Sequence, residues 1–178
     1  FKTENKEEVK VKFALSSVST NGAILNMETE IPHWDFEKTK EETQAKWNKE
    51  LAKIEVESIR EEDTETFYTA LYHTMLGPII YEDIDGKYKG LDKNIYTSDG
   101  FTNYTIFSLW DTYRALHPLF NIIQTERNNN MIKSMLAHQE QSVHGMLPIW
   151  SHYANENWCM IGYHATSVIA DAIAKNVG

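Results

Sequence analysis

The second half of the chain reads as a succession of helices, and this pattern constrains the fold more than any other feature. Residues 108–124, 126–143 and 160–178 are each predicted to form a helix. The first two are almost contiguous, and a loop interrupted by proline, 144–158, separates the second from the third. Helices connected in this way pack as successive hairpins. The sequence therefore predicts a mainly α fold with a small β portion.

Two more helices are predicted in the first half of the chain. Residues 35–57 are charged apart from apolar side chains spaced by threes and fours, and Asp35 is placed to cap the first turn. We expect this helix to pack on a core and assign no chemistry to it. Residues 61–78 carry another apolar stripe, which ends at Gly77-Pro78.

The β portion is expected in two places. Residues 9–19 alternate valine and phenylalanine with lysine, which is typical of a half-buried strand whose partners lie elsewhere. Asn21-Gly22 is a turn signal, and Pro32 breaks the chain before the first helix. Residues 79–107 are predicted to form a long irregular loop with short strand pieces, and its length indicates a functional or covering role.

Charge and hydropathy exclude two classes of partner. Among 178 residues, 17 Lys and Arg stand against 26 Asp and Glu, so the chain lacks the basic stripe that nucleic-acid binding needs. No stretch approaches the roughly 18 apolar residues of a membrane span. The single cysteine, Cys159, cannot form an internal disulfide. Both ends lie within larger sequence patterns, so we expect a piece of a longer protein.

No motif in the sequence completes a metal site. The run DIDG, residues 83–86, is similar to part of a calcium loop, but an EF-hand counted back from Gly86 would begin at Tyr81 instead of an acid. His144 and His152 are eight residues apart with a proline between them, and nothing completes a zinc set. We therefore assign no metal ligand within this chain.

The stretch that is most informative about function is FSLWDTYRALHPLF, which places Trp110, Asp111, Tyr113 and Arg114 side by side. Asp111 and Arg114 are three residues apart, so they share a face of the predicted helix. One interpretation is a local ion pair with Trp110 in the core. The other is a pocket in which Asp111 and Arg114 bind sugar hydroxyls while Trp110 packs on the apolar face of the ring.

A second group of aromatic and hydrogen-bonding residues lies in LPIWSHYANENWCMIGYH, residues 147–164. Taken singly, Glu156 is compatible with an exposed loop acid and His164 with a satisfied helix histidine. Such a density of polar and aromatic groups in a loop is better explained by a binding pocket, because loops on rigid scaffolds concentrate binding residues. We predict a cavity shared by both groups and lined by Asp111, Trp110, Arg114, Glu156 and His164.

Together with FYTALYHTMLGP and DGKYKGLD, these two stretches resemble glycoside hydrolase family 92, a family of bacterial exo-acting α-mannosidases. The resemblance covers nearly the whole chain, from the strand predicted in residues 9–19 and NMETEIPHWDFEKTK to the end of YHATSVIADA, and the order of the blocks is more specific than any one block. The family's architecture implies that residues 1–30 end a β-sandwich. It implies that 31–58 form a helical linker and that 59–178 begin an (α/α)6 barrel.

The resemblance also implies calcium-assisted hydrolysis of terminal α-linked mannose with inversion of the anomeric centre. Inversion needs two carboxylates with a water between them. In the family the acid lies in a Glu-Gly-Asn motif and the base in a motif ending Gly-Gln-Met-Ser. Neither motif occurs here, so we expect the acid, the base and most calcium ligands outside this chain. The resemblance implies that Asp111 is a ligand of mannose hydroxyls, with weaker lining or supporting roles for Trp110, Arg114, Glu156 and His164.

Two alternatives remain open from the residues alone. One is a non-catalytic carbohydrate-binding module, in which Trp110, Trp150 and Trp158 would be stacking platforms. The other is a helical-barrel glycosidase that acts on a different glycan. The family resemblance favours a mannose-containing glycan as the partner. It also implies a secreted, periplasmic or cell-surface location in a bacterium.

Overall fold

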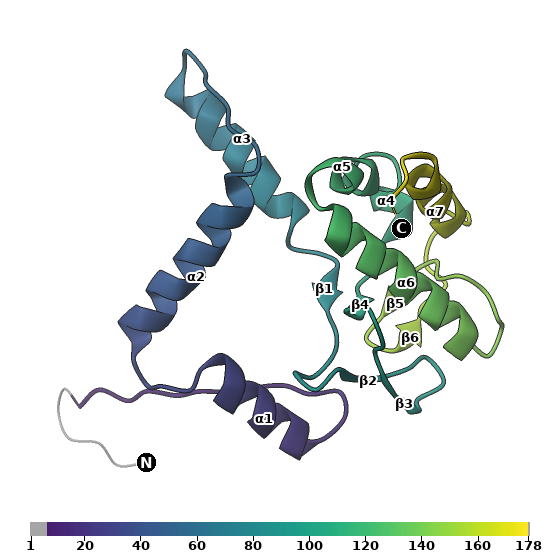
Figure 1. The fold of residues 1–178 in the computed structure, drawn as a ribbon, viewed down its shortest axis with the longest axis horizontal. Coiled ribbons are helices and arrows are strands. Elements are labelled where there is room, and N and C mark those ends of the chain that lie inside the picture. Colours follow the sequence, from purple (N-terminus) through teal and green to yellow (C-terminus); the bar gives the residue numbers. More distant parts are fainter. Residues whose placement is uncertain (1–6, 178) are drawn as a thin grey trace.

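The computed structural model describes residues 7–177, and within them the chain is mainly helical (Figure 1). The helices are α1 (Thr20–Glu30), α2 (Phe36–Leu51), α3 (Glu61–Thr74), α4 (Leu109–Thr112), α5 (Leu116–Ile123), α6 (Thr125–Gln141) and α7 (Ala165–Ala174). The strands are β1 (Ile79–Ile80), β2 (Lys87–Lys89), β3 (Ile95–Thr97), β4 (Tyr104–Thr105), β5 (Ser151–His152) and β6 (Asn155–Glu156). The predicted mainly α fold is confirmed.

The strands form three antiparallel pairs, β1 with β4, β2 with β3, and β5 with β6. In the first pair Ile79 lies opposite Thr105, and in the last Ser151 lies opposite Glu156. Four of the six strands fall in residues 79–107, so the prediction of a loop with short strand pieces is confirmed. The pairs β1–β4 and β5–β6 give rigid anchors to the loops that follow them.

The hydrophobic core is built by α5, α6 and α7 together with the segment leading into α4. Phe107, Leu109 and Met135 are almost completely buried at its centre. In Figure 1 these helices form a compact body, from which α1, α2 and α3 extend. The cluster consists of Tyr104, Phe107, Leu109, Phe120, Met131, Ile132, Met135, Ala165, Val168, Ala172 and Val177.

A chain of buried side-chain hydrogen bonds crosses the same three helices. His117 Nδ1 lies 2.8 Å from Asn128 Oδ1, and Asn128 Nδ2 donates to Asn121 Oδ1 at 2.5 Å. Asn121 Nδ2 in turn donates to Asp171 Oδ2 at 2.8 Å. These bonds satisfy polar groups that would otherwise be costly to bury, and they fix the relative positions of α5, α6 and α7.

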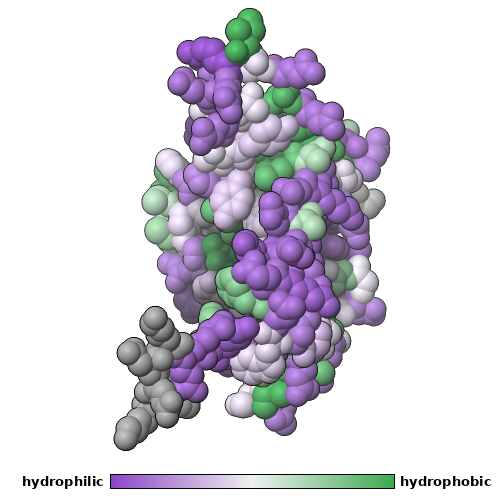
Figure 2. All heavy atoms as spheres, turned by 90° about the vertical axis from the view of Figure 1, so that its left-hand side faces the viewer, coloured by the Kyte–Doolittle hydropathy of each residue, from purple (hydrophilic) through white to green (hydrophobic). Residues whose placement is uncertain are grey.

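The helices predicted in the first half are confirmed. The Asp35 carboxylate accepts a hydrogen bond from the Lys38 amide at 3.1 Å and caps α2 as expected. Contact between α2 and α3 is made by Trp47 and Tyr72, whose ring centroids lie 4.6 Å apart. Figure 2 shows that the side of the molecule on which α2 lies is largely hydrophilic, in agreement with the charged composition of this helix.

The strand predicted for residues 9–19 is wrong. The described part of this segment is extended but pairs with no strand, and its alternating apolar side chains are exposed, Phe13 at 82%. Lys12 Nζ instead donates to the Ile31 carbonyl at 2.7 Å and lies over the ring of Trp34. Alternation alone cannot make a strand, because a strand needs a neighbouring backbone to hydrogen-bond.

The turn predicted at Asn21-Gly22 is also wrong, because both residues lie inside α1. Ser19 supplies the helix start by accepting a hydrogen bond from the Gly22 amide at 3.0 Å. A Cβ at position 22 would lie 2.2 Å from Asp83 Oδ2, so glycine is needed here for close packing. The expected break near Pro32 is confirmed, since α1 ends at Glu30.

The helix predicted for residues 108–124 is two helices, α4 and α5, with a break at 113–115. Pro118 explains the break, because in a continuous helix its ring would clash with the carbonyl of Arg114, four residues earlier. In the first turn of α5 the missing N–H of Pro118 costs nothing, because such donors have no partner within the helix. The prediction that Asp111 and Arg114 share a helix face is therefore wrong, because Arg114 lies between the two helices.

Burial makes the stability of this core dependent on pH. His138 on α6 is buried against Phe107, and burial lowers its pKa to about 4. Burial also lowers the pKa of His117, despite its hydrogen bond to Asn128. Unfolded histidine titrates near its ordinary pKa of about 6.5. Between the lowered and the ordinary pKa, the unfolded chain therefore binds more protons than the folded chain. The free energy of unfolding is highest above pH 6.5 and decreases as the pH falls below this value.

We expect His138 alone to lower the free energy of unfolding by about 2 kcal/mol when the pH is lowered from 7 to 5, because it is protonated in the unfolded chain but not in the folded one. Urea unfolding of the full-length protein at both values measures this change. A His138→Gln variant keeps a hydrogen-bonding group near the Ser151 hydroxyl, which lies 3.1 Å from His138 Nδ1, and does not titrate. Its pH dependence should be shallower by that amount. An equally steep dependence in the variant would show that His138 is not the responsible group.

Candidate active site

Trp110, Asp111 and Arg114 are exposed at the short helix α4, where Trp110 keeps 40% of its surface accessible. The Asp111 carboxylate accepts a hydrogen bond from the Ser108 hydroxyl. Arg114 Nε donates to the Tyr113 hydroxyl at 2.8 Å. Within residues 7–177, Asp111 and Arg114 form no ion pair with each other, and Trp110 is not a core residue. The first of the two interpretations of this stretch therefore does not describe the structure.

Tyr113 joins the two groups of residues that the sequence singled out. Its ring stacks on His164 with the centroids 4.0 Å apart and the planes 4° from parallel. The guanidinium carbon of Arg114 lies 5.2 Å from the centre of the Tyr113 ring. The structure thus brings Arg114 and His164 together through Tyr113. The sequence analysis quoted Tyr113 but gave it no role, because a contact across 51 positions leaves no local signal.

His164 lies at the start of α7 with an unusual environment. Its Nε2 is buried and has no hydrogen-bond partner within the described residues. Gly162 has a φ of +97°, and a Cβ at that position would lie 2.4 Å from His164 Nε2. The loop can therefore pass over the imidazole only because residue 162 is glycine. A buried ring nitrogen without a hydrogen-bond partner costs free energy, and a functional role is one explanation for it.

Glu156 holds the backbone of residues 147–164, the aromatic loop, in place. Its Oε2 accepts a hydrogen bond from the Ile149 amide at 2.9 Å. Its Oε1 accepts from the amides of Trp150 and Trp158 at 2.8 and 3.1 Å. Both oxygens are therefore occupied by the loop's own backbone. Among the described residues the Glu156 carboxylate contacts the backbone of its own loop and not Asp111. Its direct role is therefore to hold Trp150 and Trp158 in place.

The neighbouring histidine, His152, responds to the same environment. Its ring stacks on Trp150 with the centroids 5.7 Å apart. Burial lowers the pKa of His152, and the negative charge of Glu156 opposes this effect. His152 Nε2 is a second buried ring nitrogen without a partner in the described part of the chain.

The aromatic loop is pinned to the segment that leads into α4. The Phe107 amide donates to the Ser151 carbonyl at 3.0 Å, and the Tyr153 amide donates to Thr105 Oγ1 at 2.8 Å. Because Phe107 is only a few residues before Asp111, these bonds position the loop relative to the α4 residues. The arrangement presents a carboxylate, a guanidinium and an indole at the surface, a combination suited to a ligand rich in hydroxyl groups.

Carboxylates in the DIDG run have structural partners. Asp83 is 5% exposed, and accepts hydrogen bonds from Ser16 at 2.6 Å and from Asn26 at 2.9 Å. Asp85 pairs with Lys87 at 2.6 Å. Across residues 7–177 no group of three or more His, Cys, Asp or Glu side chains is arranged to hold a metal ion.

Within residues 7–177, no helix combines the length and apolar character that crossing a membrane requires.

The model of the glycosyl hydrolase family 92 catalytic domain matches residues 22–178. A relative described as an uncharacterized secreted glycosidase of Arthroderma benhamiae is 34% identical over 77 residues, which is 41% of this chain and 10% of that protein.

Two solved structures from Bacteroides thetaiotaomicron are similar over most of the chain. The family GH92 α-mannosidase BT3965 is 55% identical with a TM-score of 0.88, and the match covers 92% of this chain and 22% of that one. It has also been solved in complex with mannoimidazole. The family GH92 inverting mannosidase BT2199 is 29% identical with a TM-score of 0.84, again over 92% and 22%. The chain thus spans about a fifth of the length of these enzymes.

Proposed function

This chain belongs to glycosyl hydrolase family 92, and from this premise we propose that it is part of an enzyme that removes terminal α-linked mannose from glycans. The observation that carries the proposal is the similarity to the α-mannosidase BT3965, at 55% identity over 92% of the chain. The expected partner is a mannose-containing glycan. The secreted relative favours an extracellular location.

Three residues of the α4 region have side chains that can bind a hexose. The Asp111 carboxylate is exposed and accepts hydrogen bonds, so it can bind a pair of sugar hydroxyls. Trp110 offers an exposed indole for the apolar face of the ring. Arg114 is held by the Tyr113 hydroxyl and can donate to further hydroxyls. We assign Asp111 the main role and the other two residues supporting roles.

His164 and Glu156 act indirectly in this proposal. His164 stacks under Tyr113 and so fixes the ring that holds Arg114. Glu156 gives its carboxylate to three loop amides and is therefore a poor candidate for a catalytic acid. We propose that the acid and the base of an inverting hydrolysis are contributed by parts of the enzyme outside this chain.

Calcium is proposed for the complete enzyme, where it would bind sugar hydroxyls and favour a distorted ring. The described residues do not fit such a site, because no group of three or more candidate ligands is assembled in residues 7–177. The roles assigned to Asp111, Trp110 and Arg114 therefore do not involve calcium, and its ligands are expected elsewhere in the enzyme.

For the domains, we propose that residues 31–58 are a linker and that 59–178 begin a helical barrel. The family's architecture assigns residues 1–30 to the end of a β-sandwich, and we keep this as a proposal; in the described part of this range the chain is extended up to the helix α1. Residues 1–6 and 178 lie outside the described part of the chain.

The activity is tested by incubating the full-length enzyme with an aryl α-mannoside, with aryl β-mannoside and aryl α-glucoside as controls. We expect release of the aryl group from the α-mannoside alone. Treatment with a chelator should reduce the rate at least tenfold, on the order of the loss of one strong electrostatic contribution, and added calcium should restore it. Cleavage of the glucoside but not the α-mannoside would contradict the proposed substrate. Full activity after chelation would contradict only the role of calcium.

A further inference from the structure

We propose that a cavity between Tyr81 and Tyr153 binds a second hexose of the glycan, one other than the terminal mannose that is removed. The cavity has a volume of about 430 Å³ and is open to the surface. This is within the range of small-ligand sites. The proposal rests on the proposed function, because it takes the glycan as the ligand.

The cavity offers both types of surface that a sugar needs. The rings of Tyr81 and Tyr153 meet edge to face, with centroids 5.9 Å apart and an angle of 71°. Tyr153 is 57% exposed, so much of its ring is available to the C–H face of a hexose. An exposed tyrosine ring that borders a cavity is a frequent anchor in binding sites.

Polar atoms in the cavity wall are free to bind hydroxyl groups. Glu82 Oε2 accepts from the Asn103 amide at 2.7 Å, which fixes the carboxylate, while Oε1 has no partner among the described residues. The phenol hydroxyls of Tyr81 and Tyr153 likewise make no hydrogen bond within residues 7–177. Each of these groups can exchange hydrogen bonds with a sugar, and the carboxylate forms the stronger, charge-assisted type.

The charge of the wall selects among ligands. Its side chains include two carboxylates, Glu82 and Asp83, and no Lys, Arg or His. A phosphate or another anion would be repelled there, so the wall favours a neutral ligand. Asp83 itself is occupied by Ser16 and Asn26, which leaves Glu82 as the available acid. A neutral hexose satisfies this combination of aromatic rings and a single hydrogen-bonding carboxylate.

The cavity is built on fixed elements. The Tyr81 amide donates to the Asn103 carbonyl at 2.8 Å directly after β1, and the Tyr153 amide donates to Thr105 Oγ1 at 2.8 Å. The opposite wall is held by the bond from the Lys89 amide to Ser17 Oγ at 3.3 Å. Rings positioned in advance lose little conformational freedom when a ligand binds.

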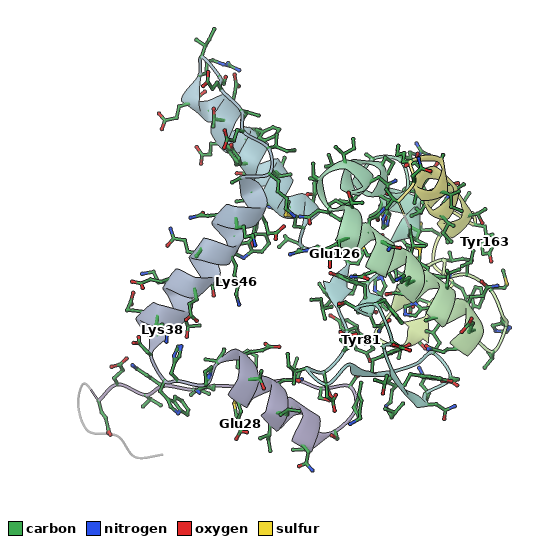
Figure 3. The ribbon with its side chains drawn as sticks, in the orientation of Figure 1. Glu28, Lys38, Lys46, Tyr81, Glu126 and Tyr163 are labelled. Atoms are coloured by element: carbon green, nitrogen blue, oxygen red, sulfur yellow. The ribbon has the colours of Figure 1, made fainter. Side chains whose placement is uncertain are left out.

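The cavity is separate from the residues assigned to the terminal mannose. In Figure 1, α4 lies beside α5 and α7, whereas β1, which leads into Tyr81, lies on the side of the body that faces α1 and α2. Figure 3 shows Tyr81 well apart from Tyr163, the neighbour of His164. The aromatic loop connects the two regions, because it contains Tyr153 and ends at His164, which stacks on Tyr113. A glycan longer than one sugar could therefore use both.

The test compares a substrate with one sugar and a substrate with several, using the full-length enzyme. We expect Tyr153→Ala to raise KM for an α-linked mannotriose about tenfold with little change in kcat, a typical cost of removing an aromatic anchor. The same variant should cleave an aryl α-mannoside like the wild type. Tyr153→Phe, which keeps the ring, should show a smaller change. Glu82→Gln keeps the acceptor for the Asn103 amide and should raise KM for mannotriose about threefold.

Phe36→Ala is the matched control, because Phe36 is an exposed aromatic residue on α2 that does not line the cavity. It should leave both substrates unchanged, and thermal unfolding of each variant confirms that it is folded. Unchanged kinetics of Tyr153→Ala with mannotriose would overturn the proposal. Equal losses with both substrates would also overturn it, because Tyr153 would then act in cleavage or folding.

Failure of the proposed function has a different signature, namely a wild-type enzyme that cleaves neither substrate. The cavity is then tested by binding alone, with saturation-transfer NMR of mannotriose. Signals that are present for the wild type and lost in Tyr153→Ala would support the cavity as a saccharide site. Absence of binding to the wild type would overturn it.

Discussion

Replacing Asp111 with asparagine in the full-length enzyme is expected to lower kcat/KM for an aryl α-mannoside about 100-fold. The carboxylate is exposed on α4 and, among residues 7–177, accepts one hydrogen bond, from the Ser108 hydroxyl, so it has the capacity to accept more from a ligand. A hydrogen bond to a charged group contributes about 1.5–3 kcal/mol, and asparagine loses both the charge and one acceptor oxygen.

Two variants show whether this loss is specific. Asp99→Asn removes an exposed carboxylate from the loop after β3 and should leave activity unchanged. Ser108→Ala removes the group that orients Asp111 and should cost less than Asp111→Asn, about threefold to tenfold, because the charge remains. If Asp111→Asn retained wild-type kcat/KM, Asp111 would not be a ligand of the sugar.

Replacing Glu156 with alanine is expected to lower the unfolding free energy by about 3 kcal/mol, because three loop amides lose their shared acceptor. Activity should fall as well, since Trp150 and Trp158 lose their fixed positions. Glutamine at this position keeps one acceptor oxygen and should cost about half as much. Urea unfolding monitored by tryptophan fluorescence measures both effects.

Glu65→Ala is the matched control for this prediction. Glu65 is exposed on α3, and surface substitutions of this kind stay within about 0.5 kcal/mol. If Glu156→Ala unfolded like Glu65→Ala but lost all activity, Glu156 would act on the substrate and not on the loop. The role assigned to it from its hydrogen bonds would then be wrong.

The sequence predicted the elements whose signals are local. Asp35 could be recognised as a helix cap because a cap acts on an amide three residues later. The break before α5 was missed, although Pro118 carried the signal that the helix cannot continue through Arg114. The helix α1 was missed because Asn21-Gly22 has a turn composition, and because the packing of Gly22 against Asp83 joins residues that are distant in sequence.

At the candidate site, the sequence indicated polar and aromatic residues at the surface but not the contacts between them. Exposure of Trp110 and Asp111 agrees with a surface that binds a ligand, but their alignment with Arg114 on one helix face was not observed. The stack of Tyr113 on His164 and the three amides on Glu156 are contacts made by folding of the loop. Gly162 was a usable signal in the sequence, because a glycine in a loop near a histidine can mark a place where the backbone passes close to a side chain.

The contact of α1 with Asp83 has a consequence for how the protein can be divided. Ser16, Asn26 and Gly22 close around a carboxylate that belongs to the start of the 79–107 loop. A truncation that began at α2 would leave this acid buried in part and deprived of both hydrogen-bond donors. Any shortened version intended to fold should therefore begin before Ser16, even though the family match starts at residue 22.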